Sequence, residues 1–126
     1  MDFLRGRLPN TFEVIRSNDP RLFALPAVVE AELRLDALKS SHPETNLRKV
    51  EAFALPFSIV PFDSACAREY AEIRAELEHS GRIIGPNDLM IAAVARANGA
   101  VLVTHNTREF KRVPRLRLED WDEIVA

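Results

Sequence analysis

Residues 86–107, PNDLMIAAVARANGAVLVTHNT, contain a helix signal, a stop signal and a strand signal in succession. The apolar run 89–95 predicts a helix that is buried on nearly all sides. We expect Gly99 to end this helix and residues 100–103 to form a buried strand. A polar loop, 104–107, follows at the C-terminal end of that strand, where open α/β sheets bind their ligands. The stretch therefore predicts an α/β fold with a binding site at this end of the sheet.

Asp88 lies in the first turn of this otherwise apolar helix. Burying a carboxylate costs free energy unless something offsets the lost hydration, and a bound cation is one such partner. A structural interpretation is also open, because the helix macrodipole and the free backbone N–H groups favour Asp in a first turn. Its position is in phase with Ile91, Ala92 and Ala95, so we expect the side chain to point toward the protein interior. This orientation makes Asp88 a candidate site residue.

The composition is typical of one globular domain, with 126 residues of which 47% are hydrophobic and 29% charged. A net charge of −2 and a pI near 5.9 argue against a general nucleic-acid-binding surface, because phosphate affinity comes largely from Lys and Arg. No apolar run approaches a membrane span, and the N-terminus lacks the pattern of a signal peptide. We therefore expect a cytoplasmic protein with no membrane partner. Cys66 is the only cysteine, which excludes an intramolecular disulfide and a thiolate zinc cluster. We interpret Cys66 as a small residue of the hydrophobic core.

Strand and helix signals alternate along the rest of the chain. Further strands are expected at 22–25, 57–60 and 116–118, and longer helices at 27–39, from Pro43 onward, and from Asp63 or Ser64 to His79. Short helical segments are expected at 2–5 and 10–16, and Trp121 is expected to pack the C-terminal tail. The predicted fold is a three-layer α/β/α domain with a short parallel sheet, spanning residues 1–126.

The helix at 27–39 offers a second candidate carboxylate. Its expected buried stripe consists of Val28, Ala31, Leu35 and Leu38. Glu32 falls about 40° to the side of this stripe and Glu30 nearly opposite it. We therefore interpret Glu32 as a site residue and Glu30 as a surface residue. The alternative is that Glu32 flanks the core and pairs with a nearby Arg.

Two inward carboxylates, Asp88 and Glu32, suit a hard divalent cation such as Mg²⁺, which prefers oxygen ligands and retains several waters. Asn106, in the loop after the strand at 100–103, offers a carbonyl oxygen, and Glu109 lies close by in the sequence. The three histidines show no metal-ligand spacing, and the chain contains neither a nucleophile elbow nor a glycine-rich phosphate loop.

Five basic residues lie within ten positions: Arg108, Lys111, Arg112, Arg115 and Arg117. Two interpretations of this cluster remain open, a solvated basic loop and a rim that contacts phosphates. In the second interpretation, we expect Arg108, Lys111 and Arg112 to bind phosphates.

Three segments carry a resemblance to a known family: GRIIGPNDLMIAAVARANGAVLVTHNTREFKRVPRLRLEDW at 81–121, VVEAELRLDA at 28–37 and PETNLRKVEAF at 43–53. They resemble PIN-domain toxins of the VapC type, the ribonuclease components of bacterial toxin–antitoxin modules. The resemblance implies an endoribonuclease dependent on Mg²⁺ or Mn²⁺, with tRNA as one possible substrate. It implies that Asp88 and Glu32 are metal-binding acids and that Glu109 is the glutamate of the -N-T-R-E-F- stretch. Asn106 falls where many PIN domains have another acidic residue.

The resemblance also implies a homodimer that binds a short antitoxin protein. The family has an aspartate in an -L-D-T-N- motif at the end of its first strand, and the opening MDFLRGR contains no such motif. Asp2 is too late to replace it, so we expect the natural start to lie upstream. The alternative function is a catalytically incompetent module that only binds an antitoxin.

Overall fold

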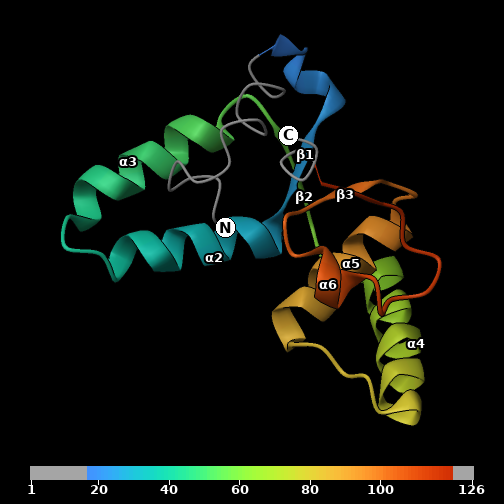
Figure 1. Ribbon diagram of the computed structural model, residues 1–126. Helices are drawn as coiled ribbons and strands as arrows, with labels where there is room; N and C mark the ends of the chain where they lie inside the picture. Colours follow the sequence, from blue (N-terminus) through green and yellow to red (C-terminus); the bar gives the residue numbers. More distant parts are fainter. Residues whose placement is uncertain (1–16, 121–126) are drawn as a thin grey trace, which may run out of the picture. The chain divides into compact units, whose positions relative to one another are not determined.

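A computed structural model describes residues 17–120 of the chain (Figure 1). The helical segments expected at 2–5 and 10–16, the start at Met1 and the packing of Trp121 lie outside the described residues. The chain divides into two compact units, Met1–Val60 and Pro61–Ala126, each of which is described by itself.

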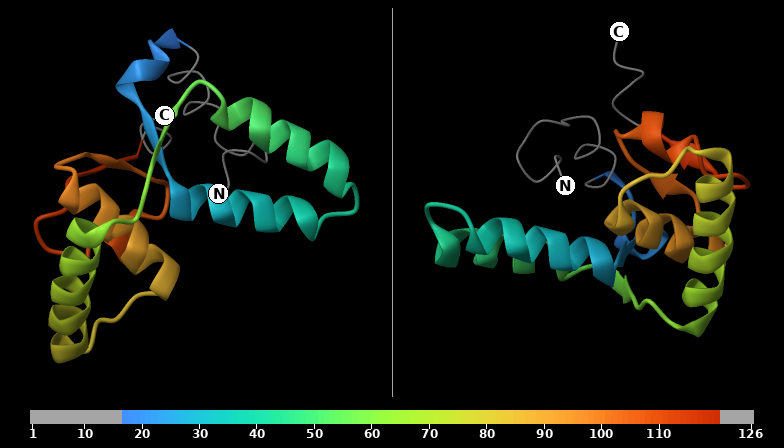
Figure 2. Two further views of the ribbon diagram at one scale, coloured as in Figure 1. Left: turned by 180° about the vertical axis from the view of Figure 1, so that it is seen from behind. Right: turned by 90° about the horizontal axis from the view of Figure 1, so that it is seen from below.

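The first unit is built from two short strands and a helical hairpin. After a 3₁₀ turn at Pro20–Leu22 come β1 (Ala24–Pro26), α2 (Ala27–Leu38), α3 (Pro43–Ala54) and β2 (Ser58–Val60). The strands β1 and β2 pair in parallel, with Leu25 opposite Ile59. Figures 1 and 2 show α2 and α3 side by side, joined by a short loop. The strand predicted at 22–25 begins two residues later, because the preceding residues are held in the 3₁₀ turn, in which the Leu22 N–H donates to the Asp19 carbonyl oxygen at 3.0 Å.

The buried face of α2 differs from the predicted stripe. Val29, Leu33 and Ala37 are buried, whereas Leu35 and Leu38 are 54% and 58% exposed. Apolar residues occur on more than one side of this helix, so periodicity alone does not choose between two stripes. The helix α3 packs against α2, and Val50 and Ala54 are its buried residues. On α2 the buried residues are those four positions apart, at 29, 33 and 37. The predicted stripe is therefore wrong.

The second unit contains α4 (Ser64–Ser80), α5 (Pro86–Ala97), β3 (Leu102–Val103), α6 (Thr107–Phe110) and β4 (Leu118–Glu119). The strands β3 and β4 pair in parallel, with Leu102 opposite Leu118. The helix α4 packs against α5, and the two helices cross at an angle in the views of Figure 2. Ile73 and Leu77 of α4 are buried, and so is almost every residue of α5 from Leu89 to Ala95, which confirms the prediction that α5 is buried on nearly all sides.

Local signals set the ends of the helices in the second unit. The Asp63 carboxylate accepts a hydrogen bond of 3.1 Å from the Cys66 N–H at the start of α4, as predicted. Gly99 has a left-handed φ of 60° after α5, and the next N–H, that of Ala100, donates to the Ala95 carbonyl oxygen at 2.9 Å. Because Ala100 belongs to this helix ending, the strand that follows is shorter than the predicted 100–103.

Helices that alternate with parallel strand pairs confirm the α/β class. Cys66 is buried, as expected of a core residue, and burial raises the pKa of its thiol. Between residues 17 and 120, no helix is both long enough and apolar enough to cross a bilayer.

Candidate functional site

Asp88 lies in the first turn of α5. This helix begins after Gly85, which supplies no side-chain cap, and the Leu89 N–H donates to the Gly85 carbonyl oxygen at 2.9 Å. The side chain is half-buried, and its neighbours in helical phase, Ile91 and Ala92, are fully buried, as the sequence predicts. The positive end of the helix macrodipole stabilises a negative charge at this position. Asp88 also has an interaction within the chain.

The loop after β3 carries the next candidates, Asn106 and Glu109. The Thr104 N–H donates to the Glu119 carbonyl oxygen at 3.1 Å, which continues the pairing of β3 with β4 to the edge of the loop. The Asn106 N–H then donates to the Thr104 hydroxyl at 3.0 Å, and the short helix α6 follows. Phe110 is buried and anchors α6, while Glu109 is half-buried and Asn106 exposed. The polar loop therefore follows the strand end, where the sequence predicts a site.

A histidine–aspartate contact in this loop was missed by sequence reasoning. The Nδ1 atom of His105 lies 3.1 Å from a carboxylate oxygen of Asp120, whose side chain is only 5% exposed. The two residues are 15 positions apart, and the parallel pairing of β3 with β4 brings their segments together. Neither residue type nor spacing signals this contact, because it depends on the path of the chain between the strands.

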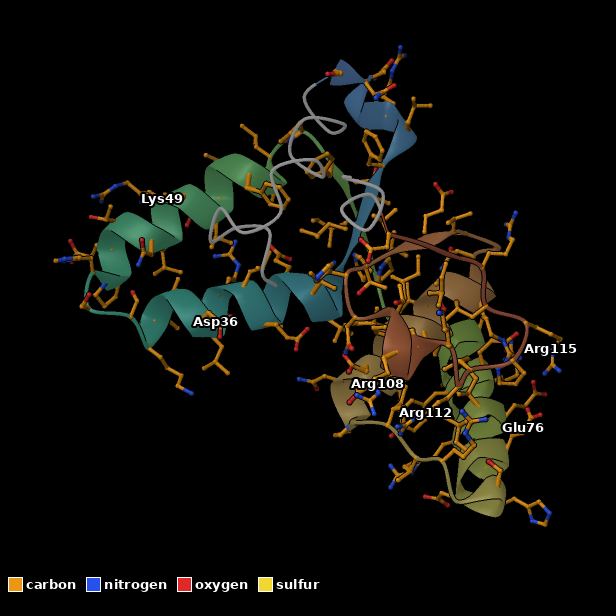
Figure 3. The ribbon with its side chains drawn as sticks, viewed as in Figure 1. Asp36, Lys49, Glu76, Arg108, Arg112 and Arg115 are labelled. Carbon is orange, nitrogen blue, oxygen red and sulfur yellow. The ribbon has the colours of Figure 1, made fainter. Side chains whose placement is uncertain are left out.

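The basic cluster separates into two kinds of residue. Arg108 and Lys111 are exposed and form no salt bridge with residues 17–120. The other three arginines contact the protein itself. The guanidinium of Arg112 donates to the Ile83 carbonyl oxygen at 3.1 Å, and that of Arg117 donates to the Gly99 carbonyl oxygen at 2.5 Å. The guanidinium of Arg115 lies 3.9 Å from the Glu76 carboxylate. Figure 3 shows Arg115 beside Glu76, away from Arg108.

The two glutamates of α2 lie in the first unit. Glu32 is half-buried and has an interaction within the chain. The Glu30 side chain is 25% exposed and accepts a hydrogen bond from Arg34, with the two ionic groups 3.2 Å apart, and the Arg34 guanidinium also lies 3.8 Å from the Glu51 carboxylate on α3. Glu30, which the sequence predicts to be a surface residue, is partly exposed and takes part in ion pairs of the helical hairpin.

The donors available for a cation are oxygen atoms of carboxylate and amide groups. Asp88, Asn106 and Glu109 belong to the second unit and Glu32 to the first. In the part of the chain that the structure describes, no group of three or more His, Cys, Asp and Glu side chains is arranged to hold a metal ion. A hard cation that retains waters needs only one or two protein carboxylates together with substrate phosphate. The chemistry of this donor set therefore fits Mg²⁺ or Mn²⁺ and does not fit a thiolate or histidine-rich metal site.

The comparison with protein families decides the class. The family model of the PIN domain matches residues 8–116, which span most of both units. The chain belongs to the PIN-domain family. Membership confirms the resemblance carried by the three sequence segments and confirms the PIN-like α/β fold.

This PIN domain is similar to named ribonucleases. It is 43% identical over 114 residues to ribonuclease VapC2 of Rickettsia felis, with 90% of this chain and 84% of the relative covered. It is 46% identical over 97 residues to the tRNA(fMet)-specific endonuclease VapC of Shigella flexneri, with 77% and 74% covered. The structure of DNA-bound VapBC from Salmonella typhimurium matches with a TM-score of 0.87 at 37% identity, covering 94% of this chain and 89% of that chain.

Proposed function

We propose that this PIN-domain protein is the ribonuclease toxin of a toxin–antitoxin module and cleaves phosphodiester bonds of RNA. The observation that carries the proposal is the 43% to 46% identity, over most of the chain, to proteins named ribonuclease and endonuclease. The Shigella flexneri relative is named for tRNA(fMet), so tRNA is the first substrate to test. RNA is made and translated in the cytoplasm, which is the location that we propose.

The acidic residues are proposed to hold a divalent cation, Mg²⁺ or Mn²⁺. Asp88 would hold it directly, and Glu32 directly or through water. When bound, the cation supplies activation of water and neutralisation of phosphate charge. The helix end at Asp88 supports this role, because the positive end of the macrodipole favours a negative charge in the first turn of α5.

The remaining site residues are proposed to act on substrate and water. Glu109 would accept a proton from the attacking water, and Asn106, at the start of α6, would orient that water through its amide. Arg108 and Lys111 would bind the phosphates that flank the cleaved bond, because their charges are exposed and not paired with other groups of residues 17–120. The PIN-domain match covers residues of both units.

The test compares Asp88→Asn with a matched control, Glu44→Gln. Both residues are first-turn carboxylates of twelve-residue helices that begin with Pro, α5 and α3, so both substitutions remove the same macrodipole contribution. We expect the purified protein to cleave tRNA in the presence of Mg²⁺, and we expect EDTA to stop this cleavage. Asp88→Asn should lower the cleavage rate at least about 100-fold, because a group that acts on the reacting phosphate is lost.

The control Glu44→Gln should cleave within about two-fold of wild type, because it tests only the helix-end contribution. Equal rates for wild type and Asp88→Asn would refute the assignment of Asp88. Binding of an antitoxin without cleavage of any RNA by the wild type would establish instead the alternative of a binding module without catalysis.

A further inference from the structure

Arg112 contacts the backbone of the loop that precedes Asp88. Its Nη1 donates to the Ile83 carbonyl oxygen at 3.1 Å, across 29 positions of sequence. The backbone of Arg112 is also held in place, because its N–H donates to the Glu109 carbonyl oxygen at 3.0 Å. Both segments lie in the second unit, and Figure 3 marks Arg112 beside α6.

The carbonyl of Ile83 belongs to the loop that leads into α5. The next residue, Ile84, is buried, and Gly85 then begins the helix without a side-chain cap. The first turn of α5 therefore depends on how the loop before it is held. Asp88 lies five residues after the carbonyl that Arg112 holds, and Glu109 lies three residues before Arg112. The hydrogen bond thus joins the two segments that carry these carboxylates.

Arg108 provides the contrast within the same short segment. It lies four residues earlier, is exposed, and forms no salt bridge with the described part of the chain. Arg112 is half-buried and directs a guanidinium donor at the protein backbone. A phosphate contact is expected of an exposed charge in no salt bridge with the described residues, whereas a guanidinium that donates to a backbone carbonyl orders the segments that it joins.

We propose that Arg112 is a positioning residue for the acidic site and that the phosphate contacts of this cluster come from Arg108 and Lys111. The proposal rests on the proposed ribonuclease function. It replaces the expectation that Arg112 binds RNA. Loss of the Arg112–Ile83 hydrogen bond should loosen the start of α5, so that Asp88 holds the cation less well, while the affinity for RNA phosphates is retained.

The experiment compares Arg112→Gln with Arg108→Gln, which remove the same charge four residues apart. Mg²⁺ binding is titrated by calorimetry without RNA, and RNA binding is measured without Mg²⁺ at several salt concentrations. We expect Arg112→Gln to weaken Mg²⁺ binding about 10-fold or more and to lower kcat, with the slope of log Kd against log salt unchanged. Arg108→Gln should flatten that slope by about 1 and raise KM, with wild-type Mg²⁺ affinity.

Hydrogen exchange supplies a readout that is independent of catalysis. The Leu89 N–H, bonded to the Gly85 carbonyl oxygen in the first turn of α5, should exchange faster in Arg112→Gln and at the wild-type rate in Arg108→Gln. If the glutamine variant does not fold, Arg112→Lys replaces it, because it retains the charge without the guanidinium fork. We expect this variant to bind Mg²⁺ more weakly and to keep the wild-type salt slope.

A flattened salt slope in Arg112→Gln with wild-type Mg²⁺ affinity and exchange would overturn the proposal and return Arg112 to the phosphate contacts. For Arg112→Lys, wild-type Mg²⁺ affinity together with wild-type exchange would overturn it in the same way. Failure of the wild type to cleave any RNA would count against the proposed function alone, because the Mg²⁺ titration and the exchange rates test the positioning role without substrate.

Discussion

Glu30 and Glu32 are two positions apart on α2, and Glu30 has a structural role in an ion pair. Its carboxylate is bound by Arg34 within the same helix. The site assignment of Glu32 cannot rest on the buried stripe, which the structure places on Val29, Leu33 and Ala37. It rests on the resemblance of residues 28–37 to a helical segment of PIN-domain toxins, and it stays a prediction.

The two glutamates provide a prediction at the residue scale. Glu32→Gln should reduce cleavage at least about 10-fold and weaken Mg²⁺ binding, because a proposed cation ligand loses its charge. Glu30→Gln should retain cleavage and lose less than about 1 kcal/mol of unfolding free energy, the loss expected for a partly exposed i, i+4 pair. Cleavage rates and urea denaturation of both variants check this. Equal loss of cleavage in both would show that the assignment of Glu32 over Glu30 is mistaken.

The helix α4 shows how a single cap acts at the scale of an element. The backbone N–H of Cys66 donates to the Asp63 carboxylate and lowers the pKa of Asp63 below its usual value. A lowered pKa in the folded state means that the charged cap stabilises the fold above the pKa of the unfolded chain. This stabilisation is lost as the pH falls through the folded pKa.

We therefore predict a pH-dependent effect of Asp63→Ala. The variant should melt at a lower Tm than wild type at pH 7, and the difference should narrow below about pH 4, where the carboxylate of an ordinary Asp becomes protonated. Asp63→Asn is the control, because its amide oxygen still accepts the hydrogen bond but carries no charge; its Tm at pH 7 should lie between those of Asp63→Ala and wild type, and its difference from Asp63→Ala should not narrow at low pH. Thermal melts from pH 3 to pH 7 test both. A Tm difference between Asp63→Ala and wild type that is constant across this range would contradict the assigned role of the charge.

At the scale of the whole molecule, the similarity to VapBC complexes bears on partners. We predict that the protein is a homodimer that binds the antitoxin encoded beside it and is inhibited by it. Asp88 and Glu109, both proposed site residues of the second unit, carry carboxylates, so we expect an antitoxin that presents a basic side chain to them. Light scattering should give the mass of a dimer, and cleavage should fall as antitoxin is titrated in.

The antitoxin residue that presents this basic side chain can be replaced by Ala. We expect the replacement to weaken binding of the antitoxin by about 2 kcal/mol or more, the loss typical of a charged contact at the centre of an interface. Calorimetry of the two antitoxin forms measures this difference. A protein that stays monomeric at high concentration and ignores the antitoxin would contradict the prediction.

The sequence by itself determined the ends of the helices, the burial of α5 and the family. Pro43 and Pro86 begin their helices, Asp63 caps α4, and Gly99 ends α5 with a positive φ, all as expected. These features depend on a few neighbouring residues, because caps and backbone dihedral angles are local properties. The family follows from the motifs of residues 81–121, which belong to one continuous segment.

Only the tertiary structure decided which face of α2 is buried and which charged residues hold the chain together. Apolar residues lie on more than one side of α2, so the packing partner chooses the stripe that contains Leu33. The contacts of Arg112 with Ile83 and of His105 with Asp120 join residues 29 and 15 positions apart. Such contacts depend on the path of the loops between elements. Sequence spacing does not predict them, because the packing of the connected elements sets the course of each loop.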